Sequence, residues 1–296
     1  MSIRITQAQL MKKLSTLFTI LFITNISFAQ KDKTILKFDK KYYEAVDKWV
    51  AFTSDKDDSE ISINFIYIDQ QAGFTMNYEC DAVITSDGLK KEKTLDNTNL
   101  KIRLTPNTGK VAILTPAQVK ELALPEQPDW LKIYKRDAEK VSYLTRMGYH
   151  YNHVGASQFA LKPLLKAYEK DPHFQGLEFE LSYAYNALKQ YEKAIPVLKK
   201  AIENNPENYY FFRELGFSYK NLNRIEDAEA IYQRGIILSD NNFEKSEMAV
   251  NMAQTYFELR NREKFDIWAK LTREYAEKGS RYAQYIDYFE SKWDKK

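Results

Sequence analysis

The side chains in this sequence that could perform chemistry are few, and they do not assemble into a known catalytic motif. His150 and His153 stand three residues apart in a segment with helical periodicity. Two imidazoles at that spacing share a metal ion only with a third ligand, and neither an HExxH motif nor a nearby pair of acids accompanies them. We interpret both histidines as solvated or packing residues and predict no metal site.

Cys80, the only cysteine, falls in phase with the apolar residues of an alternating segment, Phe74–Ala82. This placement favours a buried, inert thiol, because a catalytic cysteine needs a histidine and an orienting third group. A disulfide to a partner is the other option in an oxidising compartment. A single cysteine excludes an intramolecular disulfide and a zinc site built from a cysteine cluster.

Other reactive motifs are missing from the sequence. It contains no G-x-S-x-G and no Gly-rich strand-to-helix turn that could cradle a phosphate. Acidic residues gather at Asp55, Asp57, Asp58 and Glu60, but the spacing and terminal Glu of an EF-hand are missing, so we interpret this loop as a solvated turn. We therefore predict a protein that has no catalytic residues, no cofactor and no enzymatic activity.

The first thirty residues have the pattern of a cleavable secretory signal. Lys12 and Lys13 precede an apolar run, Leu14–Ile26, and small residues flank Phe28. The run is shorter than the roughly 20 residues of a membrane-spanning helix; an uncleaved N-terminal anchor is the alternative. Cleavage near Ala29 removes three basic residues and no acid from a chain with 44 Lys and Arg and 41 Asp and Glu. The mature chain is then neutral, so it lacks the excess of basic residues that binding to nucleic acid or an anionic membrane requires.

Residues 1–29 are accordingly predicted to be a signal peptide, starting at Met1 or, more naturally, at Met11. The expected location is periplasmic or secreted. We favour the periplasm, because the mature chain has neither a disulfide pair nor an N-x-S/T glycosylation site.

Between about residues 34 and 115, apolar and polar residues alternate, which places one set of side chains on one face of a sheet. Ile61, Ile63, Phe65 and Tyr67 show the pattern. Turn residues separate the alternating segments at 70–73, 86–88 and 106–109. Short strands with short connections favour an antiparallel meander, so residues 30–124 are predicted to form a small antiparallel β domain.

Pro125 and Pro128 interrupt this pattern, and we interpret residues 125–136 as a hinge and helix start. From there the apolar period becomes helical, and a set of positions recurs every 34 residues. These positions include Met147, Leu181 and Leu215; Tyr151, Tyr185 and Tyr219; and Ala160, Ala194 and Ala228. A period of this length indicates a solenoid of stacked helical hairpins.

This half of the chain resembles the tetratricopeptide repeat (TPR) family, whose 34-residue pattern runs through Leu-Gly, Tyr, Ala, an aromatic residue, Ala and Pro. The copies span about 141–174, 175–208, 209–242 and 246–279, and the second helix of the fourth departs from the pattern. We predict a TPR solenoid over 137–279 and a capping helix over 280–296. The capping helix has an apolar stripe of Tyr282, Ile286, Phe289 and Trp293, which could instead anchor a partner helix. The predicted fold class is α+β, with the β domain followed by an all-α solenoid of three to four hairpins.

The resemblance also implies a concave groove, lined by the first helix of each hairpin, that holds an extended peptide or a helix of a partner. The groove positions carried over are Tyr149, Asn152, His153, Phe179, Tyr183, Asn186, Arg213, Phe217, Lys220 and Asn221. Among them Tyr149, Tyr183 and Phe217 lie 34 residues apart and form an aromatic row. Aromatic rings and Asn amides suit recognition of a peptide main chain. The alternative is that these rings pack between neighbouring hairpins. The basic residues with which some members clamp a terminal carboxylate are missing here.

The sequence thus favours an exported, non-enzymatic scaffold or adaptor whose partner is another protein or peptide of the cell envelope, with no nucleic acid and no membrane span after cleavage. One alternative is a β domain that binds a small ligand or a glycan while the repeats tether it. Rings for such stacking are available at Tyr42, Tyr43, Trp49, Phe74 and Tyr78. The other alternative is an enzyme with its site at the junction of the two halves.

Overall fold

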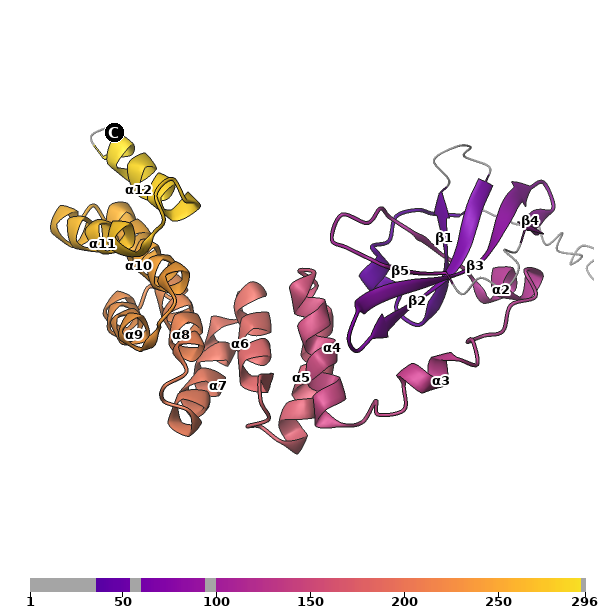
Figure 1. The fold of residues 1–296 in the computed structure, drawn as a ribbon, viewed down its shortest axis with the longest axis horizontal. Helices are drawn as coiled ribbons and strands as arrows, with labels where there is room; N and C mark the ends of the chain where they lie inside the picture. The colour runs from indigo at the N-terminus through magenta and orange to yellow at the C-terminus, as the bar shows by residue number, and fades with distance from the viewer. Residues whose placement is uncertain (1–35, 54–59, 94–99, 294–296) are drawn as a thin grey trace, which may run out of the picture.

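The computed structural model describes residues 36–53, 60–93 and 100–293. An N-terminal β-sheet leads into a curved stack of helices (Figure 1). This arrangement confirms the α+β prediction. The predicted signal peptide, with its cleavage position near Ala29, lies outside the described residues. In the described part of the chain, no helix combines the length and apolar character needed to cross a bilayer.

The sheet is antiparallel throughout. A short 3-10 helix, η1 (Tyr42–Glu44), precedes it. The strands are β1 (Lys48–Thr53), β2 (Glu60–Asp69), β3 (Gly73–Thr85), β4 (Gly88–Lys93), β5 (Lys101–Arg103) and β6 (Ala112–Ile113). Their order in space is β4-β3-β2-β1-β6, and β5 also pairs with β3. The first four strands therefore form the meander that the short connections predict.

Alternation along β2 divides its side chains between two apolar cores. Ile61, Ile63, Phe65 and Tyr67 belong to one core, and Ile66 and Ile68 to the other. Cys80 of β3 is a free, buried thiol in the first core. Burial raises the pKa of this thiol to about 11, so the group is protonated near neutral pH, as an inert thiol should be.

The first core is closed by the segment that follows the sheet. Helix α2 (Pro116–Glu121) begins at a capping box, in which the Thr115 hydroxyl accepts a hydrogen bond from the backbone N–H of Gln118. Beyond it, Trp130 and α3 (Leu131–Tyr134) lie on the sheet, with the Trp130 ring edge-on to Phe65 at 5.8 Å. The residues expected to act as a hinge, 125–136, therefore form a strap packed across the sheet.

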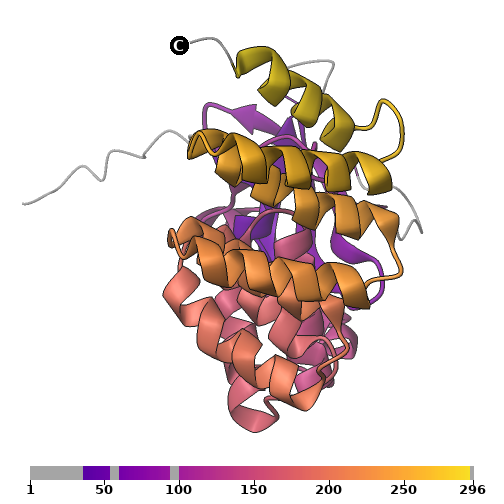
Figure 2. The same ribbon diagram turned by 90° about the vertical axis from the view of Figure 1, so that its left-hand side faces the viewer.

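The helices after residue 140 form consecutive antiparallel hairpins, stacked one above another in Figure 2. The paired helices are α4 (Val141–His153) with α5 (Ser157–Lys170), α6 (Leu177–Ala187) with α7 (Tyr191–Asn204), α8 (Tyr209–Asn221) with α9 (Ile225–Leu238), and α10 (Asn242–Glu258) with α11 (Arg262–Tyr275). Gly148 allows α4 and α5 to approach closely, because a Cβ there would lie 2.3 Å from the Leu164 side chain.

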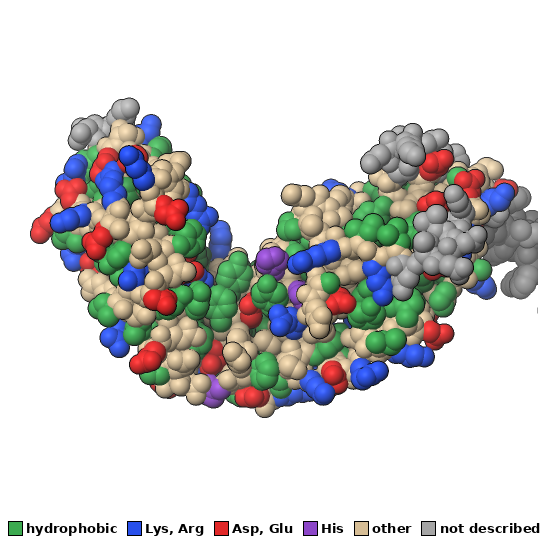
Figure 3. Space-filling view, viewed as in Figure 1, with side chains coloured by type: hydrophobic (Ala, Val, Ile, Leu, Met, Phe, Trp, Pro, Cys, Tyr) green, Lys and Arg blue, Asp and Glu red, His purple; other side chains and the backbone are tan. Residues whose placement is uncertain are grey.

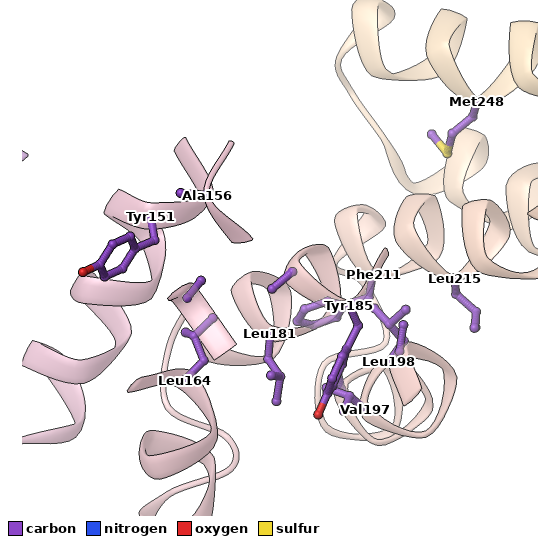
Figure 4. Close-up of a cluster of buried hydrophobic side chains, with 14 of the residues drawn as sticks. Tyr151, Ala156, Leu164, Leu181, Tyr185, Val197, Leu198, Phe211, Leu215 and Met248 are labelled. Atoms are coloured by element: carbon purple, nitrogen blue, oxygen red, sulfur yellow. The ribbon is translucent and has the colours of Figure 1, made fainter. Parts of the chain in front are cut away.

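Buried apolar side chains form one continuous core along the hairpins, part of which is shown in Figure 4. The last helix, α12 (Arg281–Lys292), closes this core with Tyr282 and Ile286. Phe289 and Trp293 continue the same stripe and stack on Phe257 and Phe265 at 4.9 and 4.8 Å. The stripe therefore covers the final hairpin, as expected of a capping helix.

The sheet docks on the first hairpin. Phe74 of β3 packs edge-on against Tyr42 and Tyr151, at 5.3 Å in both cases. Beside these rings, the backbone of Gly73 lies against the His150 imidazole, where a Cβ would come within 3.2 Å of Nδ1. An ion pair of 2.7 Å joins Lys135 to Asp47. The second apolar core of the sheet is therefore continuous with the core of the hairpins.

Candidate partner-binding groove

The first helices of the hairpins, α4, α6, α8 and α10, lie next to one another along the stack. They line the hollow that the helices and the sheet enclose (Figures 1 and 3). Two adjoining cavities, of about 210 and 370 Å³, open on this face, and Tyr183 lines both. We call the two cavities together the groove.

Most of the predicted groove residues meet there. The smaller cavity is lined by Tyr149, Asn152, His153, Phe179 and Tyr183, together with Glu180. The larger cavity brings Asn186, Arg213 and Phe217 to the other side of Tyr183. Lys220 and Asn221 line neither cavity. The structure therefore unites the aromatic row on one face, and its role in binding a partner remains a prediction.

The rings of the aromatic row are open to solvent to different degrees. Tyr149 and Tyr183 each keep 38% of their surface exposed, whereas Phe217 is half-buried. Tyr149 stacks on His153 at 5.7 Å, and the Arg146 guanidinium lies 5.6 Å from the centre of the Tyr149 ring. Phe217 meets Tyr191 edge-on at 6.1 Å. These contacts hold the rings in place without burying them, so a partner could still cover them.

The two asparagines of the groove form hydrogen bonds between neighbouring hairpins. Asn152 donates through Nδ2 to the backbone oxygen and to Oε2 of Glu180, at 2.9 and 2.8 Å. Asn186 repeats this pair of bonds to Glu214 one hairpin later, at 3.0 and 2.9 Å. The Oδ1 of Asn186 accepts from Ser218 as well. The Asn186 amide is therefore used in joining neighbouring hairpins, and its role in binding a partner remains a prediction.

Arg213 is held by acidic side chains rather than left free for a ligand. It forms ion pairs of 2.9 Å with Glu214 and 2.5 Å with Glu244. Burial works against its charge, but the carboxylates of Glu214, Glu244 and Glu247 outweigh burial and raise the pKa of Arg213. Its guanidinium also lies over the rings of Phe179 and Tyr210, at 5.6 and 5.3 Å. These contacts hold the Arg213 side chain, and the carboxylates and rings that it touches, in fixed positions in the groove.

The two remaining predicted residues, which lie outside the cavities, also bond within the chain. Lys220 donates to the side-chain oxygens of Asn251 and Gln254 at 2.8 and 3.3 Å, and burial lowers the pKa of its ammonium. Asn221 donates to the backbone oxygen of Phe217 in its own helix at 2.8 Å. The polar groups of both side chains are therefore used within the chain, and neither residue lines the groove.

The groove also contains residues that the sequence reasoning did not select. Glu180, Tyr191, Tyr232 and Glu247 all line it. One signal was available, because Glu180 and Glu214 are 34 residues apart, like the asparagines they bind. Burial raises the pKa of Glu180 and of Glu247. The surface is therefore partly acidic as well as aromatic.

The two neighbouring histidines separate in the structure. His150 is buried against the β2–β3 turn, where its Nε2 lies 3.3 Å from the backbone oxygen of Gln70, and burial lowers its pKa. His153 stays exposed at the groove. Within residues 36–53, 60–93 and 100–293, no group of three or more His, Cys, Asp or Glu is placed to hold a metal ion.

The rings suggested for glycan stacking lie mainly in the sheet domain's core. Tyr42, Trp49 and Phe74 are buried, and the Trp49 Nε1 donates to the backbone oxygen of Pro125 at 2.8 Å. They are therefore not available as a stacking surface. Trp49 also borders a cleft of about 780 Å³ beneath α2, whose apolar lining includes Leu114, Val119 and Leu124.

Comparison with known proteins gives a family match in the helical half. Residues 185–245 match the family model described as tetratricopeptide repeat. No curated protein matches the sequence.

Several solved structures are similar in part. MamA from AMB-1 is 23% identical, with 52% of this chain and 82% of that chain covered and a TM-score of 0.42. TTC0263, a TPR protein of Thermus thermophilus, is 21% identical, with 55% and 86% covered and a TM-score of 0.44.

The family match falls on α7, α8 and α9, with the last residues of α6 and the start of α10. The bond from Asn186 to Glu214 lies in that stretch, and Asn152 and Glu180 form the same bond one hairpin earlier. Residues 185–245 of this chain therefore carry tetratricopeptide repeats.

Proposed function

We propose that this protein is an exported, non-enzymatic interaction module that binds an extended segment of another envelope protein in the groove. The observation that carries the proposal is the aromatic row. Tyr149, Tyr183 and Phe217 keep surface open along two adjoining cavities, whereas most other large apolar side chains of these helices are buried. Exposed rings in a concave surface are typical of partner-binding sites, since they offer contact area at modest entropic cost.

Two carboxylates of the groove, those of Glu180 and Glu214, refine this proposal, and we call them the acidic floor. Glu180 and Glu214 are tied to Asn152 and Asn186, so the floor is fixed before a partner arrives. A surface held in one conformation loses little entropy on binding. We therefore expect the partner segment, rather than the groove, to become ordered when the complex forms.

Substituting alanine at Tyr149, Tyr183 and Phe217 together should abolish capture of the partner from the producing cell. Because these rings are exposed or half-buried, the thermal midpoint should fall by only a few degrees. The matched control replaces Ile237, Ile267 and Tyr288 by alanine, all of them more than half exposed and outside the cavities. Equal capture of the partner by both triple variants would show that the groove is not the binding site.

Export is a separate part of the proposal and rests on the pattern of residues 12–29. Expressed with its full N-terminus, the protein should accumulate in the periplasm with Gln30 as its first residue. Mass spectrometry of the purified protein measures this directly. A protein that keeps residues 12–29 and stays in the cytoplasmic fraction would contradict export. That result would not contradict the proposal that the groove binds a partner.

A further inference from the structure

The larger cavity of the groove has features of a site for one particular kind of side chain. Three rings, those of Tyr183, Tyr191 and Phe217, line it together with the carboxylate of Glu247. Its volume of about 370 Å³ exceeds what a single side chain fills, so a residue of a bound segment can enter with part of its backbone.

Tyr232 brings an unpaired hydroxyl group to the same cavity. This residue is fully buried, with 0% of its surface exposed, and it lines the cavity. Among the described residues its hydroxyl oxygen has no hydrogen-bond partner. Gly216 makes room for the ring, since a Cβ there would lie 2.6 Å from it. A buried, unpaired hydroxyl costs free energy, and a ligand that carries a hydrogen-bonding group would remove that cost.

The carboxylates around the cavity are unequally paired. Glu214 accepts from Asn186 and Arg213, and Glu244 accepts from Arg213 at 2.5 Å. Glu247 contacts the same guanidinium at 3.9 Å, beyond hydrogen-bonding distance. Lys189 lies exposed at the rim. Arg213 is therefore shared by three carboxylates, and its contact with Glu247 is the longest of the three. Arg281 and the Tyr282 hydroxyl also face Glu247.

From these contacts we propose that the larger cavity receives a cationic side chain of the partner segment, an arginine above all. A guanidinium would stack on the rings of Tyr183 or Phe217 and donate hydrogen bonds to Glu247 and to the hydroxyl oxygen of Tyr232. The chain already shows this geometry, because Arg213 lies over Phe179 and Tyr210. This inference rests on the proposed function, and it names the type of residue in the partner segment that the groove recognises.

Other side chains fit the cavity less well. An aliphatic side chain would bury Glu247 and leave the Tyr232 hydroxyl unpaired, which is unfavourable. An acidic side chain would add a further negative charge beside Glu214, Glu244 and Glu247, and the guanidinium of Arg213 is already engaged by them. An arginine side chain can stack on the rings, pair with the carboxylate and donate a hydrogen bond to the hydroxyl at the same time.

A random peptide library displayed on phage and selected on the immobilised full chain tests the inference. We expect one position of the enriched peptides to be arginine or lysine. Selection on Glu247→Gln should lose this preference, whereas Glu263→Gln, which changes an exposed acid of α11, should keep it. A synthetic peptide from the first selection should bind Glu247→Gln about tenfold more weakly, and its Arg-to-Gln analogue should not distinguish the two proteins.

Tyr232→Phe gives a second and independent test. Because the hydroxyl has no partner among the described residues, its removal should leave the thermal midpoint unchanged or slightly higher, while the arginine peptide binds several-fold more weakly. Unchanged affinity in both Tyr232→Phe and Glu247→Gln would overturn the inference.

The selection also separates this inference from the proposed function. Peptides that are enriched on the wild-type chain, lost on the Tyr149, Tyr183 and Phe217 triple variant, but free of a fixed cation would contradict the inference alone. If the wild-type chain enriches no peptide beyond those of the triple variant, both the groove proposal and the inference are wrong.

Discussion

At the residue scale, the repeat spacing locates side chains better than it reveals what they bind. The spacing of 34 placed Tyr149, Tyr183 and Phe217 on one face, and the structure unites them there. It did not reveal that the Asn186 amide bonds Glu214 of the next hairpin. Such a bond depends on the angle between neighbouring hairpins, which the sequence does not state. The same limit explains why Glu247 and Tyr232 were not selected from the sequence.

Replacing Asn186 by alanine should destabilise the protein, because it removes the buried hydrogen bonds that this amide forms with Glu214 and Ser218. A lost bond of this kind costs about 1–3 kcal/mol, and chemical denaturation measures it. Asn221→Ala is the matched control, because its amide is exposed and bonds only its own helix; we expect a change of less than about 0.5 kcal/mol. Equal effects of the two substitutions would show that the bonds between hairpins contribute nothing.

At the element scale, the periodicity of two predicted the sheet and its faces, and the periodicity of the repeats predicted the hairpins. The strap at 125–136 was interpreted differently, as a hinge, because its two prolines signal a break in regular structure. A break in secondary structure is compatible with tight packing. Trp130 and Tyr134 lie against Tyr67 at 5.0 and 4.6 Å. Local sequence signals report secondary structure, and such contacts arise only from the tertiary fold.

The docking of β3 on α4 should contribute measurably to stability. Phe74→Ala removes a ring that is buried between Tyr42 and Tyr151, so the free energy of unfolding should fall by about 3–5 kcal/mol. Urea denaturation followed by tryptophan fluorescence reports both halves, since Trp49 and Trp130 pack in the first core of the sheet and Trp268 and Trp293 pack in the core of the hairpins. Phe243→Ala, at a more exposed ring, should cost much less. A loss below about 1 kcal/mol for Phe74→Ala would show that the docking is weak.

At the scale of the whole molecule, the sheet and the capped stack of helices enclose one hollow (Figure 3). The groove lies among the first helices of the hairpins, which line this hollow (Figure 1). No sequence pattern predicts that Phe74 and Tyr151 meet, because the two halves were recognised by unrelated periodicities. Their contact places the sheet on one side of this hollow. The central claim that follows is that the partner enters this hollow and touches the aromatic row.

The most direct measurement is photo-crosslinking in the producing cells. Benzoylphenylalanine, a photo-crosslinking residue, replaces Tyr183 in one protein and Ile237 in a second, and the cells are irradiated. Ile237 is 72% exposed and lies outside the groove. We predict a specific adduct of higher mass from position 183 and none from position 237. An adduct that forms from position 237, with none from position 183, would contradict binding in the groove.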